Sequence, residues 1–366
     1  MEMKVSLYKY LIIVTDYPNN NGGKALYYVH NRNLEYHRVG LDITVLNFSA
    51  SNNYVIDNIN VITLNEYKKN IHAFNILISH APNLRHHIKF ILRYGNNFIK
   101  YFFFFHGHEV LRIQKVYPKP YEYIKGNCLK NFILDMYDIL KLNILHYFFF
   151  FCRKKSHFIF VSNWMLNEFE KWIKLNRNEL NNKFSIIYNS VSNVFENDKY
   201  DINKLKKYDF ITIRSYMDES KYCIDIVNRI AKENIDKVFL IIGKGDYFKY
   251  NEKSPNIIWV NQVLSQEDIV NYLNESKVAL MPTRTDAQGV MMCEMATFGI
   301  PVITSDISVC REVFEGFKNV SYIDNEEPKI KDLKFEFTQF INDKYYKQNT
   351  IYKEIKLLRN FINENI

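Results

Sequence analysis

Short runs of apolar residues alternate with longer amphipathic segments along most of the chain. In the first half, the runs that predict strands are 10–15, 41–46, 75–79, 99–105, 157–162 and 184–188. Because they are mostly apolar and continuous, they are typical of parallel strands that are covered on both faces. A helix is expected over 25–39, with Gly40 at its carboxyl-terminal cap.

The same alternation starts again after residue 208. The predicted strands there are 210–214, 238–243, 257–260, 278–282 and 300–304, and the predicted helices are 222–233, 266–275 and 289–298. The polar segment 192–208 is typical of a linker. We therefore predict an α/β fold of two doubly wound, Rossmann-like domains, at 1–194 and 195–344. The amphipathic helix 345–366 is expected to pack back on the first domain.

Ligands of open parallel sheets bind beyond the carboxyl ends of the strands. With two such sheets, the expected site is a cleft in which the two domains face each other. The motifs described below all follow the end of a predicted strand, as this geometry requires.

The net charge of +8 is concentrated in one part of the chain. Between residues 81 and 160 there are 13 Lys and Arg residues against 4 Asp and Glu residues, with many Phe and Tyr residues among them. This combination suits an anionic membrane surface or nucleic acid. A solvated surface is the plain alternative.

Five cysteines without a Cys-x-x-Cys spacing favour reduced thiols in a cytoplasmic protein over a disulfide framework or a zinc site. The amino-terminal apolar run is too short and too interrupted for a signal peptide. The most apolar stretch elsewhere, 132–152, contains Asp135, Asp138, Lys141 and His146, so we do not interpret it as a membrane span.

The segment 281–294 carries the clearest chemical signal, because a strand, a loop and a helix follow one another there. Gly289 and Val290 would place free backbone amides at a helix amino terminus, where phosphate oxygens bind. Asp286 lies in the preceding loop. Glu294 lies in an otherwise apolar helix, so it should be buried, and a buried carboxylate needs a partner.

This segment resembles the Glu-x7-Glu region of retaining glycosyltransferases of family 4, which have the GT-B fold. The resemblance covers nearly the whole chain and is strongest over 210–314. Asp286 stands where the family usually has its first Glu. The resemblance implies roles for Asp286 and Glu294 at the donor sugar, and it implies that Arg214 and Lys221 hold the donor diphosphate. Tyr222 stands where Gly usually follows that Lys.

The resemblance also implies roles for three further segments. Gly243 and Gly245 follow a predicted strand and would lie beside the nucleotide. In the first domain, Gly22 and Gly23 follow the first strand, where the family has a loop over the acceptor and the donor phosphate. His106, after strand 99–105, matches a histidine near the reacting sugar, and His80 is a second candidate.

The resemblance implies transfer of a sugar from a UDP- or GDP-sugar to a saccharide or lipid-linked acceptor, with retention, in surface polysaccharide or glycoconjugate synthesis. We find no metal-binding Asp-x-Asp in a suitable place and expect metal independence and no cofactor. Three alternatives remain open. They are a sugar-nucleotide epimerase, a non-catalytic sugar-nucleotide-binding protein, and an RNA-binding protein, for which no signature is found.

Overall fold

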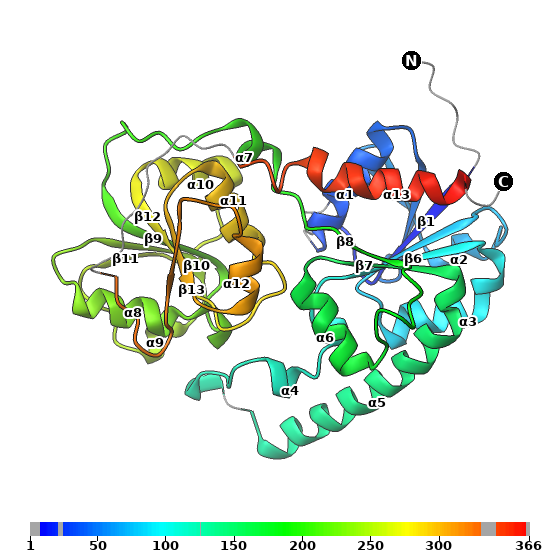
Figure 1. Ribbon diagram of the computed structural model, residues 1–366, viewed down its shortest axis with the longest axis horizontal. Helices are drawn as coiled ribbons and strands as arrows, with labels where there is room; N and C mark the ends of the chain where they lie inside the picture. Colours follow the sequence, from blue (N-terminus) through cyan, green and yellow to red (C-terminus); the bar gives the residue numbers. More distant parts are fainter. Residues whose placement is uncertain (1–7, 21–24, 125, 331–341, 364–366) are drawn as a thin grey trace. The chain divides into compact units, whose positions relative to one another are not determined.

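The computed structural model describes residues 8–20, 25–124, 126–330 and 342–363 (Figure 1). Contacts divide the chain into two units, which are described one at a time. The first unit comprises Met1–Arg112, Met136–Tyr188 and Ile351–Ile366. The second comprises Ile113–Asp135 and Asn189–Thr350.

The first unit is built on an eight-stranded sheet with the strand order β3-β4-β2-β1-β5-β6-β7-β8. All neighbours are parallel except β3 and β4, which form an antiparallel pair. The strands are β1 (Lys9–Val14), β2 (Asp42–Asn47), β3 (Tyr54–Ile56), β4 (Ile59–Ile62), β5 (Ile76–His80), β6 (Lys100–Phe105), β7 (Ser156–Phe160) and β8 (Phe184–Ile186). The central strands are apolar and buried because helices cover both faces.

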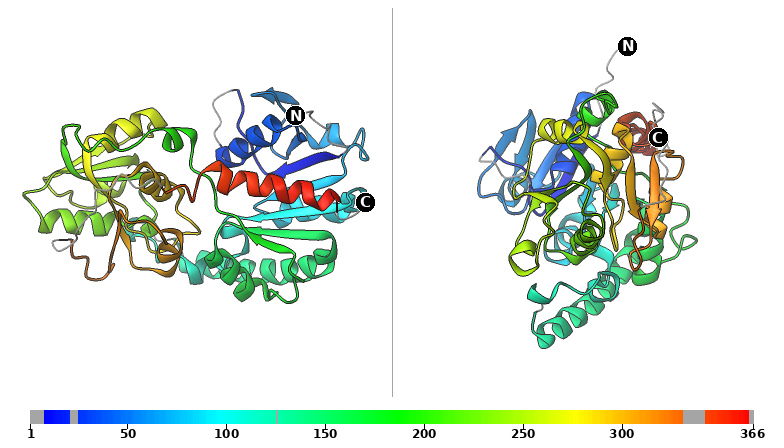
Figure 2. Two further views of the ribbon diagram at one scale, coloured as in Figure 1. Left: turned by 45° about the horizontal axis from the view of Figure 1, so that its top comes forward. Right: turned by 90° about the vertical axis from the view of Figure 1, so that its left-hand side faces the viewer.

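Helices α1 and α13 lie over one face of this sheet, and α5 and α6 lie over the other (Figures 1 and 2). The helices of this part of the chain are α1 (Tyr27–Arg38), α2 (Leu64–Tyr67), α3 (Lys89–Tyr94), α5 (Cys128–Cys152), α6 (Asn163–Ile173) and α13 (Ile351–Asn363). Of α5, the part from Met136 onward belongs to the first unit. Although α13 comes last in the sequence, Ile351, Ile355 and Leu358 belong to the buried cluster of β1, β2 and α1. The carboxyl-terminal helix therefore completes the core of the first unit.

The second unit has a six-stranded parallel sheet in the order β11-β10-β9-β12-β13-β14. Its strands are β9 (Tyr208–Tyr216), β10 (Phe239–Lys244), β11 (Ile257–Val260), β12 (Ser276–Leu280), β13 (Val302–Ser305) and β14 (Val320–Ile323). Its helices are α4 (Ile113–Val116), α7 (Asn193–Asn197), α8 (Ile224–Glu233), α9 (Tyr247–Tyr250), α10 (Gln266–Asn274), α11 (Val290–Phe298) and α12 (Ser308–Val313). Because every strand runs the same way, all the loops that follow strands meet at one edge.

The α/β fold with two parallel-sheet domains is confirmed. The expected bounds assigned 113–135 to the first domain, whereas contacts place this segment in the second unit. The hydroxyl groups of Tyr121 and Tyr123 explain the difference, because they donate to Asp225 (2.9 Å) and Asp218 (2.7 Å). Within the described ranges, no helix has the length and apolarity needed to cross a membrane.

Candidate functional site

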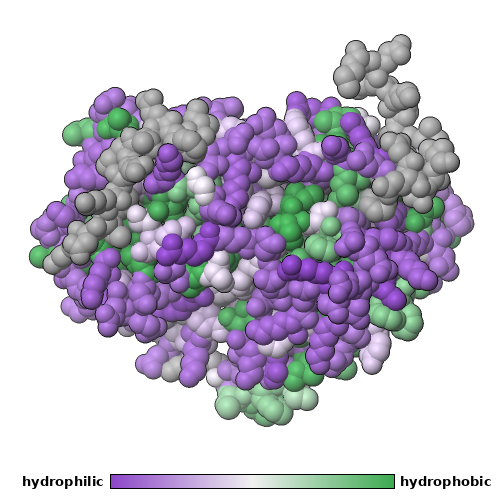
Figure 3. Space-filling model, in the orientation of Figure 1, coloured by the Kyte–Doolittle hydropathy of each residue, from purple (hydrophilic) through white to green (hydrophobic). Residues whose placement is uncertain are grey.

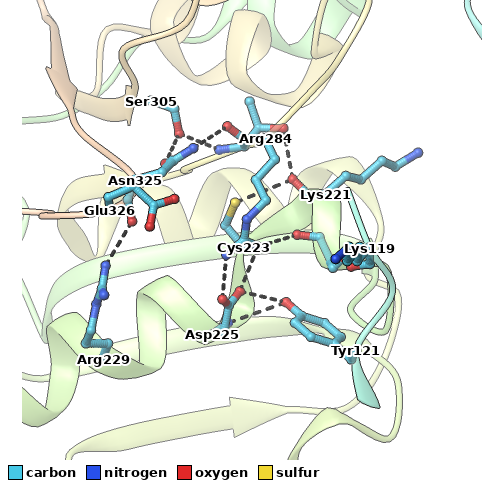
Figure 4. A network of polar contacts seen from close by, with 12 residues as sticks. Lys119, Tyr121, Lys221, Cys223, Asp225, Arg229, Arg284, Ser305, Asn325 and Glu326 are labelled. Atoms are coloured by element: carbon cyan, nitrogen blue, oxygen red, sulfur yellow. Dashed lines mark hydrogen bonds and ion pairs between the residues drawn. The ribbon is translucent and has the colours of Figure 1, made fainter. Parts of the chain in front are cut away.

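The loops that follow β9, β12, β13 and β14 are joined by hydrogen bonds at the carboxyl edge of the second sheet (Figure 4). The carbonyl of Lys221 accepts from the Arg284 amide (2.9 Å) and from the Thr283 hydroxyl (3.1 Å). The Asn325 side chain donates to the Thr283 carbonyl (3.1 Å) and accepts from the Ser305 hydroxyl (2.6 Å). This network fixes the loops in which Lys221, Asp286 and Gly289 lie.

A two-pronged ion pair strengthens the network. Arg284 donates to both carboxylate oxygens of Asp225, at 3.0 and 2.6 Å, and also to the Ser220 carbonyl (2.6 Å). Burial raises the pKa of Asp225, but Arg284 outweighs this effect and lowers the pKa below its ordinary value. Arg284 and Asp225 therefore neutralise each other. Arg284 stabilises the loops of the site, but its charge is already paired and is not available to a ligand.

Arg214 differs from Arg284 because it is a buried guanidinium without a carboxylate against it. It lies near the end of β9 and is 6% exposed. One terminal nitrogen donates to the Pro282 carbonyl (2.7 Å), whereas Nε is buried and has no hydrogen-bond partner among the described residues. Burial lowers its pKa. A buried positive charge with an unused donor is costly unless a ligand pairs with it.

Lys221 lies in the loop that follows β9, the strand that contains Arg214. A carboxylate and two tyrosine rings surround its ammonium group. Its ammonium pairs with Glu219 (2.7 Å) and lies 4.9 and 4.8 Å from the ring centres of Tyr117 and Tyr222. Burial opposes the charged form, but the two tyrosines and Glu219 raise the pKa of Lys221 overall. Because Glu219 is largely exposed, Lys221 can exchange this partner for an anionic ligand.

The loop before α11 is shaped by Asp286. Oδ1 of Asp286 accepts from the amides of Ala287 (2.8 Å) and Gln288 (3.3 Å), and Oδ2 has no hydrogen-bond partner among the described residues. Gly289 caps the helix with φ of 70°, a left-handed conformation that favours glycine. The amide of Val290 in the first turn has no partner inside the helix. Asp286 is also close enough to Arg214 to act on its pKa.

Glu294 is buried, as expected, but the structure does not join it to the other predicted residues by any hydrogen bond or ion pair in the described ranges. It is 6% exposed, and its carboxylate accepts from the backbone amide of Ser192 (3.3 Å). Burial raises the pKa of Glu294 to about 7. The charged form is therefore unfavourable in the fold until a donor of hydrogen bonds reaches it.

This burial predicts a pH dependence of stability. The folded-state pKa of about 7 lies above the ordinary value of 4.5, so the folded protein holds the proton more tightly than the unfolded chain. The contribution of Glu294 therefore falls as the pH rises from about 4.5 to 7, by about 3 kcal/mol in all. Urea unfolding of wild type and Glu294→Gln from pH 5 to 8 measures it. We expect the variant to gain stability relative to wild type as the pH rises, and a constant difference would contradict this.

Gly243 and Gly245 have a packing role that the sequence did not reveal. A Cβ at Gly243 would lie 2.1 Å from the carbonyl oxygen of Arg214, and one at Gly245 would lie 3.0 Å from the carboxylate of Asp218. Asp218 in turn accepts from the Asp246 amide (2.9 Å). The two glycines thus allow the turn after β10 to lie directly against β9 at Arg214, and their contact with a nucleotide stays a prediction.

In the first unit, His106 lies after β6 and is half-buried. Its Nε2 is 3.2 Å from Nδ1 of His80, the last residue of the neighbouring strand β5. The carboxylate of Glu109 accepts from the backbone amides of His106 and Gly107 and fixes the turn. The predicted phosphate loop at Gly22 and Gly23 lies outside the described residues.

Comparison with known proteins finds a family match within the second unit. Residues 211–334 match the family model described as glycosyl transferases group 1. This part of the chain is similar to the domains of that family. It contains the predicted catalytic residues Asp286 and Glu294 and the predicted donor-binding residues, which are Arg214, Lys221, Gly243, Gly245, Gly289 and Val290.

Solved structures extend the likeness to the fold of the whole chain, which is GT-B. Sucrose-phosphate synthase from Thermosynechococcus elongatus is 12% identical, with a TM-score of 0.59 over 87% of this chain and 86% of that one. WaaG, a glycosyltransferase involved in lipopolysaccharide biosynthesis, is 12% identical, with a TM-score of 0.55 over 86% of each chain. TarM is 11% identical, with a TM-score of 0.54 over 87% of this chain and 89% of that one.

A curated relative is similar over a shorter stretch. It is the "Uncharacterized 41.2 kDa protein in cps region" of Klebsiella pneumoniae, 26% identical over an alignment of 154 residues that covers 36% of this chain. The match spans 39% of the length of that relative.

A contact that holds the loop before α11 was not predicted from the sequence. The Gln288 side chain exchanges two hydrogen bonds with the backbone of Asn189, accepting from its amide (2.6 Å) and donating to its carbonyl (3.0 Å). Such pairs join positions about 100 residues apart, and no local pattern marks them.

In the described ranges, no three His, Cys, Asp or Glu side chains form a group that could hold a metal ion.

Proposed function

We propose that the protein is a retaining glycosyltransferase of the hexosyltransferase type, which moves a sugar from a UDP- or GDP-sugar to a saccharide or lipid-linked acceptor. The observation that carries the proposal is Arg214, a buried guanidinium with an unpaired Nε that lies close to Asp286. A diphosphate would supply the missing negative charge. The group 1 match over 211–334 supports the same class of donor.

The residues of the second unit suit the departure of a diphosphate. Arg214 offers a planar set of donors and Lys221 a mobile point charge, and phosphates pair well with both. The free amides at the start of α11 add the positive end of a helix dipole. Together they would stabilise charge that develops on the leaving group, and we propose that they do so without a metal ion.

The carboxylates of Asp286 and Glu294 would contact the sugar and nucleoside parts of the donor. Oδ2 of Asp286 is not used within the described fold, so it can accept from a hydroxyl group of the sugar. The buried carboxylate of Glu294 receives one long hydrogen bond, at 3.3 Å, and suits a pair of neighbouring hydroxyl groups. We propose that the product is a surface polysaccharide or glycoconjugate, and the cps-region relative favours this acceptor class.

A direct test uses the purified protein with a panel of UDP- and GDP-sugars. Thermal shift identifies the donor, and mass spectrometry follows its transfer to saccharide and lipid-linked acceptors, with and without EDTA. We expect transfer with retained configuration that persists in EDTA. Isomerised donor without an acceptor would identify an epimerase, and binding without turnover would identify a non-catalytic protein. Loss of activity in EDTA that Mg²⁺ or Mn²⁺ restores would disprove metal independence.

We further propose that the enzyme docks on the anionic cytoplasmic surface of a membrane through α5. Within the first unit, this helix exposes an apolar stripe at spacings of three and four residues, namely Met136, Leu140, Ile144, Tyr147 and Phe151, with Tyr137 beside Met136. Figure 3 shows an apolar patch at the lower edge of this view, where the beginning of α5 lies in Figure 1. Exposed Lys154 follows the helix, and this stretch of chain is strongly basic. An apolar stripe with basic neighbours suits the interface of anionic lipid.

This proposal predicts that Leu140→Glu with Phe151→Glu lowers binding to vesicles containing phosphatidylglycerol at least tenfold, because each buried apolar side chain contributes about 1.5–3 kcal/mol. Flotation at low and high salt measures the bound fraction. Leu205→Glu, at a position in the second unit that is 78% exposed, is the matched control and should bind like wild type. Equal binding of all three proteins, or dimer formation through α5 in light scattering, would contradict membrane docking.

A further inference from the structure

Two histidines meet at the carboxyl edge of the first sheet. His80 ends β5, and His106 follows β6, its parallel neighbour. Nδ1 of His80 lies 3.2 Å from Nε2 of His106, and the rings are 5.4 Å apart and nearly parallel. His80 also stacks on Phe104 at 4.4 Å. The two rings therefore have a fixed geometry and share one hydrogen bond.

Neither ring carries a charge at neutral pH. Burial and the positive charge of Arg32 on α1 lower the pKa of both His80 and His106 well below the ordinary value. Other titratable groups that face the pair are Tyr28 on α1, His87 on the helix after β5, and His108 and Glu109 after β6. Each neutral ring has one N–H, so only one of the two rings donates across the 3.2 Å contact.

The direction of this bond follows from the other nitrogen of His80. Nε2 of His80 is buried, in a side chain that is 1% exposed, and has no hydrogen-bond partner among the described residues. If His106 donated, the proton of His80 would have to stay on Nε2 as a buried N–H without an acceptor, which is unfavourable. If His80 donates from Nδ1, Nε2 keeps only a lone pair, and the charge of Arg32 favours a lone pair over an N–H.

We infer that His80 is a positioning residue that donates from Nδ1 to Nε2 of His106 and so fixes the proton of His106 on Nδ1. Nδ1 of His106 has no hydrogen-bond partner among the described residues, and the ring is half-buried, so this N–H is left for a ligand. His106 then presents a hydrogen-bond donor to an oxygen of the substrate. It does not act as a general base through Nδ1, because that nitrogen already carries its proton.

The tautomer can be measured without any substrate. Long-range ¹H–¹⁵N NMR of the full chain with ¹⁵N-histidine distinguishes protonated from bare ring nitrogens, and His106→Gln assigns the signals. We expect wild-type His106 to carry its proton on Nδ1. His80→Asn keeps a donor and should preserve this state. His80→Asp offers an acceptor and should move the proton to Nε2. His72→Asn, at an exposed histidine before β5, is the control and should change nothing.

Protonation of wild-type His106 on Nε2, or the same tautomer in His80→Asn and His80→Asp, would overturn the inference. Its catalytic meaning rests on the proposed function, which is tested separately. For sugar transfer, we expect His80→Asn to stay within about threefold of wild-type kcat and His80→Asp to lose about 10- to 100-fold. The expected tautomers without sugar transfer by wild type would contradict the proposed function alone. Transfer that His80→Asp leaves unchanged would overturn the donor role of His106.

Discussion

Replacing Arg214 with methionine is expected to lower kcat/KM for the donor sugar by about 100- to 1000-fold, the usual effect of removing a preorganised donor from developing negative charge. The guanidinium is buried at the end of β9, and its Nε has no partner within the described structure. Since a diphosphate is the ligand that would complete its interactions, methionine removes this attraction while roughly keeping the volume. Arg214→Lys keeps the charge but not the planar set of donors, so it should recover part of the activity.

Stability separates this role from a structural one. A residue that held the fold would lower the free energy of unfolding when replaced. Arg214 is a buried charge without a carboxylate against it in the described fold, so Arg214→Met should unfold at an equal or higher urea concentration than wild type. Arg311→Met is the control, because Arg311 is exposed and pairs with Asp306 at 2.7 Å. It should change neither quantity. A destabilised Arg214→Met with unchanged kcat/KM would contradict the diphosphate role.

Much of the fold could be predicted because most of its strands are apolar runs. Such runs can be recognised in the sequence without knowing which strands lie beside them. The helix that begins after Gly289 and ends at Gly299 was also marked by its two caps, and both glycines have a positive φ. The short strands β3 and β4 were missed, although their turn left a signal. Asp57 and Asn58 form a two-residue connection in which both have positive φ, as tight hairpins require.

The sequence suggested the residues of the candidate site, and it did not indicate their contacts. Asp286 and Arg214 were expected at strand ends, and the parallel sheet places both at one edge. Nothing in the local sequence indicated that Arg284 pairs with Asp225 whereas Arg214 lacks a carboxylate, since both are arginines near strand ends. Whether an arginine is paired depends on which carboxylates the fold places beside it. Arg284 is paired with Asp225, so Arg214 is the arginine that can bind a ligand.

A buried contact between α1 and α13 was likewise not indicated by any local sequence pattern. Arg32 on α1 donates to Glu354 on α13 at 3.0 and 3.3 Å, and the Tyr36 hydroxyl donates to the same carboxylate at 2.7 Å. The exposed fractions of Arg32 and Glu354 are 2% and 0%. Arg32→Met would leave the Glu354 carboxylate buried without its cation, and we expect a loss of about 3–5 kcal/mol in the free energy of unfolding.

Two comparisons test whether this loss comes from the stranded charge. Arg32→Met combined with Glu354→Leu should recover most of the stability, because well-packed apolar side chains replace a buried ion pair at little cost. Arg38→Met, also on α1, breaks a pair with Glu35 in which the arginine is 62% exposed, and it should cost less than about 1 kcal/mol. Urea unfolding measures all three variants. If the double variant were as unstable as Arg32→Met alone, lost packing rather than an unpaired carboxylate would be the cause, and α13 would hold the first unit by its apolar face.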